Sequence, residues 1–133
     1  MKRIAPYLAA AALALLPAAV QAHGDETVAR AFAHPLPNLP GKVITAAVVS
    51  YPPGGKSVAH RHAPSAFIVA YVLSGEIRSQ VEGEPAKVYK PGQSWHEAPG
   101  AHHVISENAS KTKPAKLLAI FVMTAGETLT TPD

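Results

Sequence analysis

Beyond residue 41 the sequence alternates short apolar runs with turn-forming residues. The runs are rich in Val, Ile, Leu and Ala, and Gly or Pro closes most of them. Strands at a spacing of roughly 8–12 residues, with turn signals between them, are typical of β-sandwiches and β-barrels, and no helical period is evident after residue 22. The pattern predicts an all-β domain with strands over Val43–Tyr51, Ala66–Leu73, Glu76–Val81, Ala86–Lys90, Gln93–Glu97, His102–Ser106 and Lys116–Met123.

The first 22 residues have the order of a secretory signal peptide. Lys2 and Arg3 form a basic start, an apolar run covers residues 8–16, and residues 20–22 have the small-x-small form of a cleavage site. An uncleaved membrane anchor is the rival interpretation, but a spanning helix needs about 20 apolar residues, more than this run supplies. We expect cleavage after Ala22, a periplasmic or secreted mature protein, and no membrane contact after cleavage.

The two segments that flank the predicted domain lack its strand pattern. Residues 23–41 hold three prolines and show no strand or helical periodicity. Because proline blocks a helix and restricts the residue before it, we expect an extended, Pro-rich N-terminal arm that lies on the domain or on a neighbouring subunit. Residues 42–124 are the predicted β-barrel domain, and residues 125–133 a polar C-terminal tail.

Composition narrows the class of protein once the signal is set aside. The 133-residue precursor has a net charge of +3 and a sequence pI near 9.3, but Lys2 and Arg3 account for two of those charges. The mature chain is therefore almost neutral. It has neither a basic stripe nor interleaved aromatics, so we expect no nucleic acid partner. The chain lacks cysteine, so packing or a metal must stabilise it, and any metal ligands must be nitrogen or oxygen.

A histidine pair at residues 60 and 62 is the first candidate for chemistry. On a strand, residues i and i+2 point to the same face, so the imidazoles of His60 and His62 would project together. Adjacent imidazoles repel when protonated and are costly to bury unpaired, and a shared divalent metal removes both problems. The alternative is a solvated surface pair. Of a second pair, His102 and His103, only one can face the same site, because neighbouring strand residues point to opposite sides.

Both histidine pairs sit in segments that resemble the two motifs of the cupin superfamily. The first motif is matched by Gly54, five residues, His60-Arg61-His62 and Gly75, and the second by Pro91-Gly92, Pro99-Gly100-Ala101-His102-His103 and Asn108. The resemblance covers residues 42–124 and implies a single-domain jelly-roll β-barrel. It carries the family's metal ligands onto His60, His62 and His103, and it implies a divalent metal cofactor, which could be Fe, Mn, Zn, Ni or Cu.

One ligand of the cupin pattern is missing from this chain. The first motif usually carries a Glu a few residues after its second His, and the corresponding position here is Phe67 or Ile68, depending on the end from which one counts. Neither side chain can bind metal. A fourth ligand is therefore absent or comes from elsewhere, with Gln80, His96 and Glu97 as unranked candidates. Three imidazoles with water in the open positions suit a catalytic centre better than a closed structural one.

Five further residues have both a functional and a structural interpretation. Phe67, Tyr71 and Trp95 can line an apolar pocket beside the metal, although packing in the barrel core is the commoner role of such aromatics. His23 would become the mature N-terminus and could then chelate copper through its amine and imidazole, although a frayed end is the commoner outcome. Arg78 would hold a carboxylate substrate only if its strand face lines the cavity.

Two functions fit these residues, and fold analogy alone does not choose between them. The first is a periplasmic cupin that binds a divalent metal through its histidine cluster and acts on a small organic molecule, with dioxygenase-like or isomerase-like chemistry. The second is a non-catalytic module that binds or senses a small ligand or the metal. A purely structural barrel with surface histidines is a weaker third. Because cupins commonly pair through their sheets, the resemblance also implies a homodimer.

Overall fold

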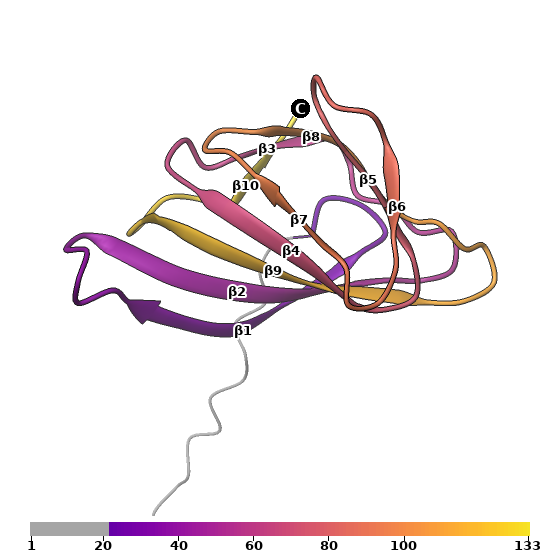
Figure 1. The fold of residues 1–133 in the computed structure, drawn as a ribbon, viewed down its shortest axis with the longest axis horizontal. Helices are drawn as coiled ribbons and strands as arrows, with labels where there is room; N and C mark the ends of the chain where they lie inside the picture. The colour runs from indigo at the N-terminus through magenta and orange to yellow at the C-terminus, as the bar shows by residue number, and fades with distance from the viewer. Residues whose placement is uncertain (1–21) are drawn as a thin grey trace, which may run out of the picture.

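The computed structural model describes residues 22–133, which form two five-stranded antiparallel sheets that face each other (Figure 1). The strand order is β1-β2-β9-β4-β7 in the first sheet and β10-β3-β8-β5-β6 in the second. The strands are β1 (Thr27–Pro35), β2 (Lys42–Tyr51), β3 (His60–His62), β4 (Phe67–Ser74), β5 (Ile77–Val81), β6 (Lys87–Tyr89), β7 (Ser94–Glu97), β8 (His102–Asn108), β9 (Ala115–Thr124) and β10 (Thr130–Pro132). The predicted all-β jelly-roll is confirmed.

The described part of the chain contains no helix. Residues 22–133 accordingly hold no helix that is long and apolar enough to cross a membrane. The signal peptide expected over residues 1–22 lies outside the described residues except for Ala22, so its cleavage stays a prediction.

The seven predicted strands correspond to β2 and to β4 through β9, with ends that differ by one or two residues. Within residues 23–41, where we expect an extended arm, the structure has a strand that the sequence pattern did not show. Residues Thr27–Pro35 pair with β2 as an edge strand. Nearly all of these residues are exposed, so they carry no alternation of apolar and polar positions from which a strand could be predicted.

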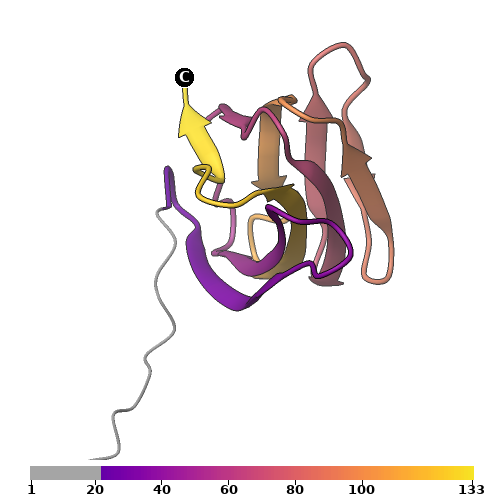
Figure 2. The ribbon, with the colours of Figure 1, turned by 90° about the vertical axis from the view of Figure 1, so that its left-hand side faces the viewer.

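The polar C-terminal segment is also bound to the domain rather than free. Thr130 lies opposite His62 where β10 pairs with β3, and the backbone N–H of Asp133 donates to the carbonyl of Ala59 at 3.1 Å. Figure 2 shows β10 in yellow beside the start of the described chain in indigo. Both ends of the described chain therefore lie on the same side of the domain.

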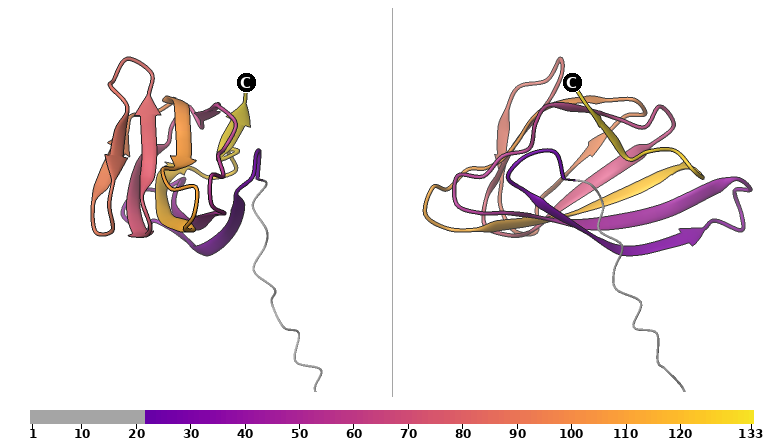
Figure 3. Two further views of the ribbon diagram at one scale, coloured as in Figure 1. Left: turned by 90° about the vertical axis from the view of Figure 1, so that its right-hand side faces the viewer. Right: turned by 180° about the vertical axis from the view of Figure 1, so that it is seen from behind.

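The core fills the space between the two sheets. Alternate residues of β9 are buried, as expected for a strand with one inward face, and the largest fully buried side chains are Val72, Ile68, Ile77 and Met123. The outer face of the first sheet is apolar in part, with Phe67 and Tyr71 of β4 exposed by 44% and 43%. The views in Figure 3 show the first sheet curving around the space between the two sheets.

Candidate metal centre

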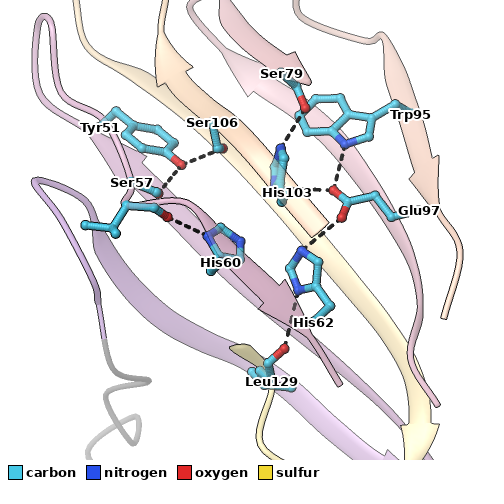
Figure 4. A network of polar contacts seen from close by, with 11 residues as sticks. Tyr51, Ser57, His60, His62, Ser79, Trp95, Glu97, His103, Ser106 and Leu129 are labelled. Carbon is cyan, nitrogen blue, oxygen red and sulfur yellow. Dashed lines mark hydrogen bonds and ion pairs between the residues drawn. The ribbon is translucent and has the colours of Figure 1, made fainter. Parts of the chain in front are cut away.

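Two of the candidate ligands lie on β3, a three-residue strand between β10 and β8. Strand alternation turns His60 and His62 into the space between the sheets, where each is only 8% exposed, while Arg61 between them faces outward. The two rings are adjacent in Figure 4, with their centroids 4.8 Å apart. The pair therefore shares one inner face, as the i, i+2 spacing predicts.

The third imidazole comes from β8. His103 lies directly opposite His60 in the antiparallel register and is 5% exposed. His102 faces the other way, with its Nε2 2.9 Å from the carboxylate of Asp133, so only one residue of this pair reaches the site. One nitrogen from each of His60, His62 and His103 lies within 4.8 Å of the other two. A single ion can reach all three nitrogens.

Backbone carbonyls hold the outer nitrogens of the β3 pair. The carbonyl oxygen of Val58 lies 2.7 Å from Nδ1 of His60, and that of Leu129 lies 3.3 Å from Nδ1 of His62. In metal centres, such a partner fixes the tautomer and the ring orientation of a ligating histidine. Each ring thus keeps its Nε2 for a metal.

A β-bulge in β8 turns the side chain of His103 into the site, where Ser79 of β5 contacts it. The pairing of β5 with β8 shifts register after Gln80, which gives β8 one extra residue. As a result both His103 and Ser106 are buried although they are three residues apart. Ser79 of β5 places its hydroxyl 2.8 Å from Nε2 of His103. The other ring nitrogen, Nδ1, lies 3.5 Å from a carboxylate oxygen of Glu97.

Glu97 is the only one of the three fourth-ligand candidates that lies in the site. It projects inward from β7 and is 2% exposed, with one carboxylate oxygen 2.9 Å from Nε2 of His62 and the other 3.5 Å from Nδ1 of His103. His96 is exposed on the opposite face of β7. Gln80 donates to a backbone carbonyl at the surface.

The position of Glu97 accounts for the carboxylate that the first motif lacks. In the first sheet β4 pairs with β7, and Ile68 lies directly opposite Glu97. Ile68 is one of the two positions at which the family pattern expects its Glu. The two inward side chains are neighbours across one pair of strands, so the carboxylate comes from the adjacent strand and still lies beside the histidines.

Burial and charge set the protonation of the site. Burial lowers the pKa of His60 and lowers that of His103 to about 4, so both rings are neutral at pH 7 and can bind a metal. Burial alone would raise the pKa of Glu97, but contacts with His62 and His103 and a hydrogen bond from Trp95 outweigh it and lower the pKa to about 2. Glu97 is therefore ionised, and the nearby rings of His60 and His103 are neutral at pH 7.

The polar groups of the site fit a divalent cation. Nε2 of His62 and Oε2 of Glu97 are both buried and lie 2.9 Å apart, and neither atom has a further hydrogen-bond partner. A buried, ionised carboxylate beside the neutral rings of His60 and His103 is costly in a low dielectric unless a cation compensates its charge. A metal ion would accept a lone pair from each of these atoms. Three nitrogens and a carboxylate oxygen suit Zn, Fe, Mn, Ni or Cu.

A cavity of about 80 Å³ opens beside the three rings. Its walls are mostly apolar and include Val49, Leu117 and Phe121. Of the three aromatic residues considered for a pocket or for the barrel core, Trp95 fills both roles. Both expectations were wrong for Phe67 and Tyr71, because β4 turns these two residues to the outer face of its sheet.

A polar group at one end of the cavity was missed by sequence reasoning. The hydroxyl of Tyr51 lies 2.7 Å from Oγ of Ser57 and 2.8 Å from Oγ of Ser106. Burial raises the pKa of Tyr51 to about 12, so this hydroxyl stays protonated at neutral pH. The three residues come from β2, a loop and β8, and no motif or spacing marks them as a group. Arg78, by contrast, faces outward and pairs with Glu107.

Comparison with known proteins identifies the family and the fold. A family model for the cupin domain matches residues 47–121, which is more than half of the chain. A search of curated protein sequences finds no match. An RmlC-like cupin from Shewanella frigidimarina is 19% identical with a TM-score of 0.59, and the alignment covers 83% of this chain and 86% of that one.

Two solved enzymes also share the fold. A DMSP lyase from Ruegeria pomeroyi is 25% identical with a TM-score of 0.57, over 67% of this chain and 42% of the lyase. An oxalate oxidase in complex with the substrate analogue glycolate is 22% identical with a TM-score of 0.57, over 66% of this chain and 45% of the oxidase. This chain thus spans less than half the length of either enzyme. With the family match and the buried histidine triad, the chain belongs to the cupin family.

Proposed function

We propose that this cupin binds one divalent metal ion through His60, His62 and His103, with Glu97 as the adjacent carboxylate ligand. The observation that carries the proposal is the convergence of three buried imidazole nitrogens within 4.8 Å of one another. The ion would supply Lewis-acid or oxygen-activating chemistry to a small organic molecule in the cavity. Dioxygenase-like and isomerase-like reactions are the classes that we propose, in a protein exported to the periplasm.

The chain's own residues would hold and orient the reacting groups. Carbonyl oxygens fix the rings of the β3 pair, and the indole N–H of Trp95 donates to Glu97 at 3.0 Å and fixes that carboxylate. The apolar walls would exclude water from the centre, which strengthens its electrostatic interactions. At the far end, the protonated Tyr51 hydroxyl can donate a hydrogen bond to a polar group of a bound molecule.

Two observations, one on related proteins and one on this chain, support a small substrate. The solved structures that share the fold include a DMSP lyase and an oxalate oxidase bound to glycolate. The cavity of about 80 Å³ is far below the roughly 300–1,000 Å³ of pockets that take drug-sized ligands. We therefore propose a substrate of only a few non-hydrogen atoms.

The same small cavity favours the second candidate function, a non-catalytic module that binds or senses the metal. Glu97 is already engaged by Trp95 and His62, so it is not free to move a proton. Among the described residues, Glu26 is the only other carboxylate that lines the cavity. A metal sensor needs the ligands but no proton donor or acceptor beside the substrate.

Elemental analysis of the exported protein tests the metal centre. We expect stoichiometric metal in the wild-type protein and its loss in a variant that carries His60→Ala and His62→Ala. His96→Ala is the matched control, because this exposed histidine lies outside the site. Absence of metal from the wild-type protein would overturn the proposal.

An oxygen-uptake and product screen against small acids, thiols, phenolics and diketones separates the two functions. Turnover that disappears with the double histidine variant supports an enzyme. No turnover by a fully metal-loaded protein supports the binding module.

A further inference from the structure

A carboxylate outside the metal centre is buried without a matching cation. Glu26 precedes β1, is 7% exposed and lines the cavity near His60. One of its oxygens, Oε1, accepts a hydrogen bond from the backbone nitrogen of His23 at 3.0 Å. The other oxygen, Oε2, is buried and has no hydrogen-bond partner, and no ion pair within residues 22–133 involves Glu26. Burial of such a carboxylate is unfavourable unless a cation is paired with it.

The short segment that carries the His23 nitrogen is held in place. The backbone N–H of Asp25 donates to the carbonyl of Lys56 at 2.9 Å, and Lys56 returns a bond from its own N–H to the Asp25 carboxylate at 3.3 Å. A Cβ on Gly24 would lie 2.4 Å from that carbonyl and 2.7 Å from Oε2 of Glu26. Only glycine fits there, so this turn directs the His23 nitrogen at the buried carboxylate.

The His23 nitrogen is also the atom that the expected processing step would charge. Hydrolysis of the bond between Ala22 and His23 by a signal peptidase adds water across it, leaving a carboxylate on Ala22 and an ammonium group on His23. An α-ammonium group has three N–H donors and a positive charge at pH 7. An amide nitrogen has one donor and no charge.

We propose that the new N-terminus of the processed chain forms a buried ion pair with Glu26 and closes this end of the cavity. The ammonium group would keep the bond to Oε1 and provide a donor for Oε2. β10 lies beside this segment (Figures 2 and 3), and its residue Thr130 lines the same cavity as His23. Removal of the signal would thus complete the cavity wall as well as release the protein. This inference rests on processing after Ala22 and not on the metal.

Thermal unfolding of metal-free protein tests the ion pair. The full-length chain is produced with export, giving the processed form, and without export, giving the unprocessed form, and intact mass locates the N-terminus. We expect Glu26→Gln to lower the Tm of the processed form by about 4 °C or more. The same variant should leave the unprocessed form unchanged or stabilise it, because it removes an unpaired buried charge. Glu84→Gln, at an exposed carboxylate between β5 and β6, should change both forms equally.

The reactivity of the new amine gives a second readout that does not depend on stability. An amine-reactive reagent at pH 7 should label the N-terminus of the processed wild-type protein several-fold more slowly than that of the Glu26→Gln variant. A mature chain that begins at another residue, an equal effect of Glu26→Gln on both forms, or equal labelling of both proteins would each overturn the proposal. None of these results bears on the metal centre, which the elemental analysis tests separately.

Discussion

The carboxylate of Glu97 determines whether the three histidines are joined by a fourth protein ligand. Glu97 is buried, ionised and in contact with two of the three imidazoles. Glu97→Gln keeps the size of the side chain and an oxygen that can accept the Trp95 N–H, but it removes the charge. We expect metal affinity to fall by about 10- to 100-fold, the range that a lost polar contact at a metal site commonly produces.

Competition against a chelator of known affinity measures that change. Glu107→Gln is the control, because this carboxylate pairs with Arg78 at the surface. Equal affinity of the Glu97→Gln variant and the wild-type protein would show that Glu97 is not a ligand.

The buried histidines make the metal-free protein sensitive to acid. Burial lowers the pKa of His103 from 6.5 to about 4, so the unfolded chain binds a proton near pH 6.5 that the folded protein does not bind until about pH 4. The contribution of neutral His103 to stability is therefore fully present above pH 6.5 and is lost as the pH falls through this window. Glu97, whose pKa is lowered to about 2, acts in the same direction below its ordinary value of 4.5.

We expect the Tm of the metal-free protein to fall between pH 6.5 and 4, with a shallower slope in the His103→Gln variant. Thermal melts across this range in a chelating buffer measure both slopes. His34→Gln, at an exposed position on β1, should follow the wild-type slope. Parallel curves for wild type and His103→Gln would contradict the expectation.

Strand pairing explains which parts of the fold and site could be predicted from the sequence and which could not. Gly and Pro punctuation marked β2 and β4 through β9, and strand alternation placed His60 and His62 on one face. The choice of Glu97 over Gln80 and His96 could not be made, because it depends on which strands are neighbours. Residues 75–93, which include two other strands, separate β4 from β7 in sequence, and no local pattern reports such a pairing. β1 escaped prediction because it is exposed on both faces.

The pairing of Ile68 with Glu97 predicts that the carboxylate can be moved between strands. A protein that carries Ile68→Glu and Glu97→Gln has its glutamate at position 68 of β4, one of the positions at which the family pattern expects it. We expect this double variant to recover part of the metal affinity lost in Glu97→Gln alone, because the two side chains are direct cross-strand neighbours on the inner face. Chelator competition gives the affinity.

The stability of the same proteins is a necessary control. Ile68 is 1% exposed, so Ile68→Glu alone places a second carboxylate in the core and should lower the Tm. Bound metal should offset part of this loss in the double variant. A double variant that is folded in thermal melts but binds metal no better than Glu97→Gln would argue against equivalent positions.

For the whole molecule, the outer face of the first sheet is the surface to examine for assembly. Tyr71 lies in register with Leu118 of β9, and Leu118 with Val48 of β2, so apolar side chains form a row across three strands. Phe67 extends the patch along β4. Contiguous exposed apolar surface of this kind often marks an interface, and we propose that two copies of this chain pair through it.

Sedimentation at micromolar concentration should show twice the mass of one chain. Tyr71→Lys should shift the protein to the mass of a single chain, since it places a charge in the apolar row. Val88→Lys is a matched control with 42% exposure on the other sheet, close to the 43% of Tyr71. A wild-type protein that sediments as a single chain would refute pairing.

The position of β10 has a practical consequence for handling this protein. The carbonyl of Leu129, directly before this strand, orients His62, and the strand itself pairs with β3, which carries two of the three histidines. The described chain begins beside β10, and its residue His23 lines the same cavity. A purification tag fused to either end would therefore lie next to the cavity and could disturb the residues that line it. A polyhistidine tag would also compete for the metal, so metal content and turnover should be measured on untagged protein.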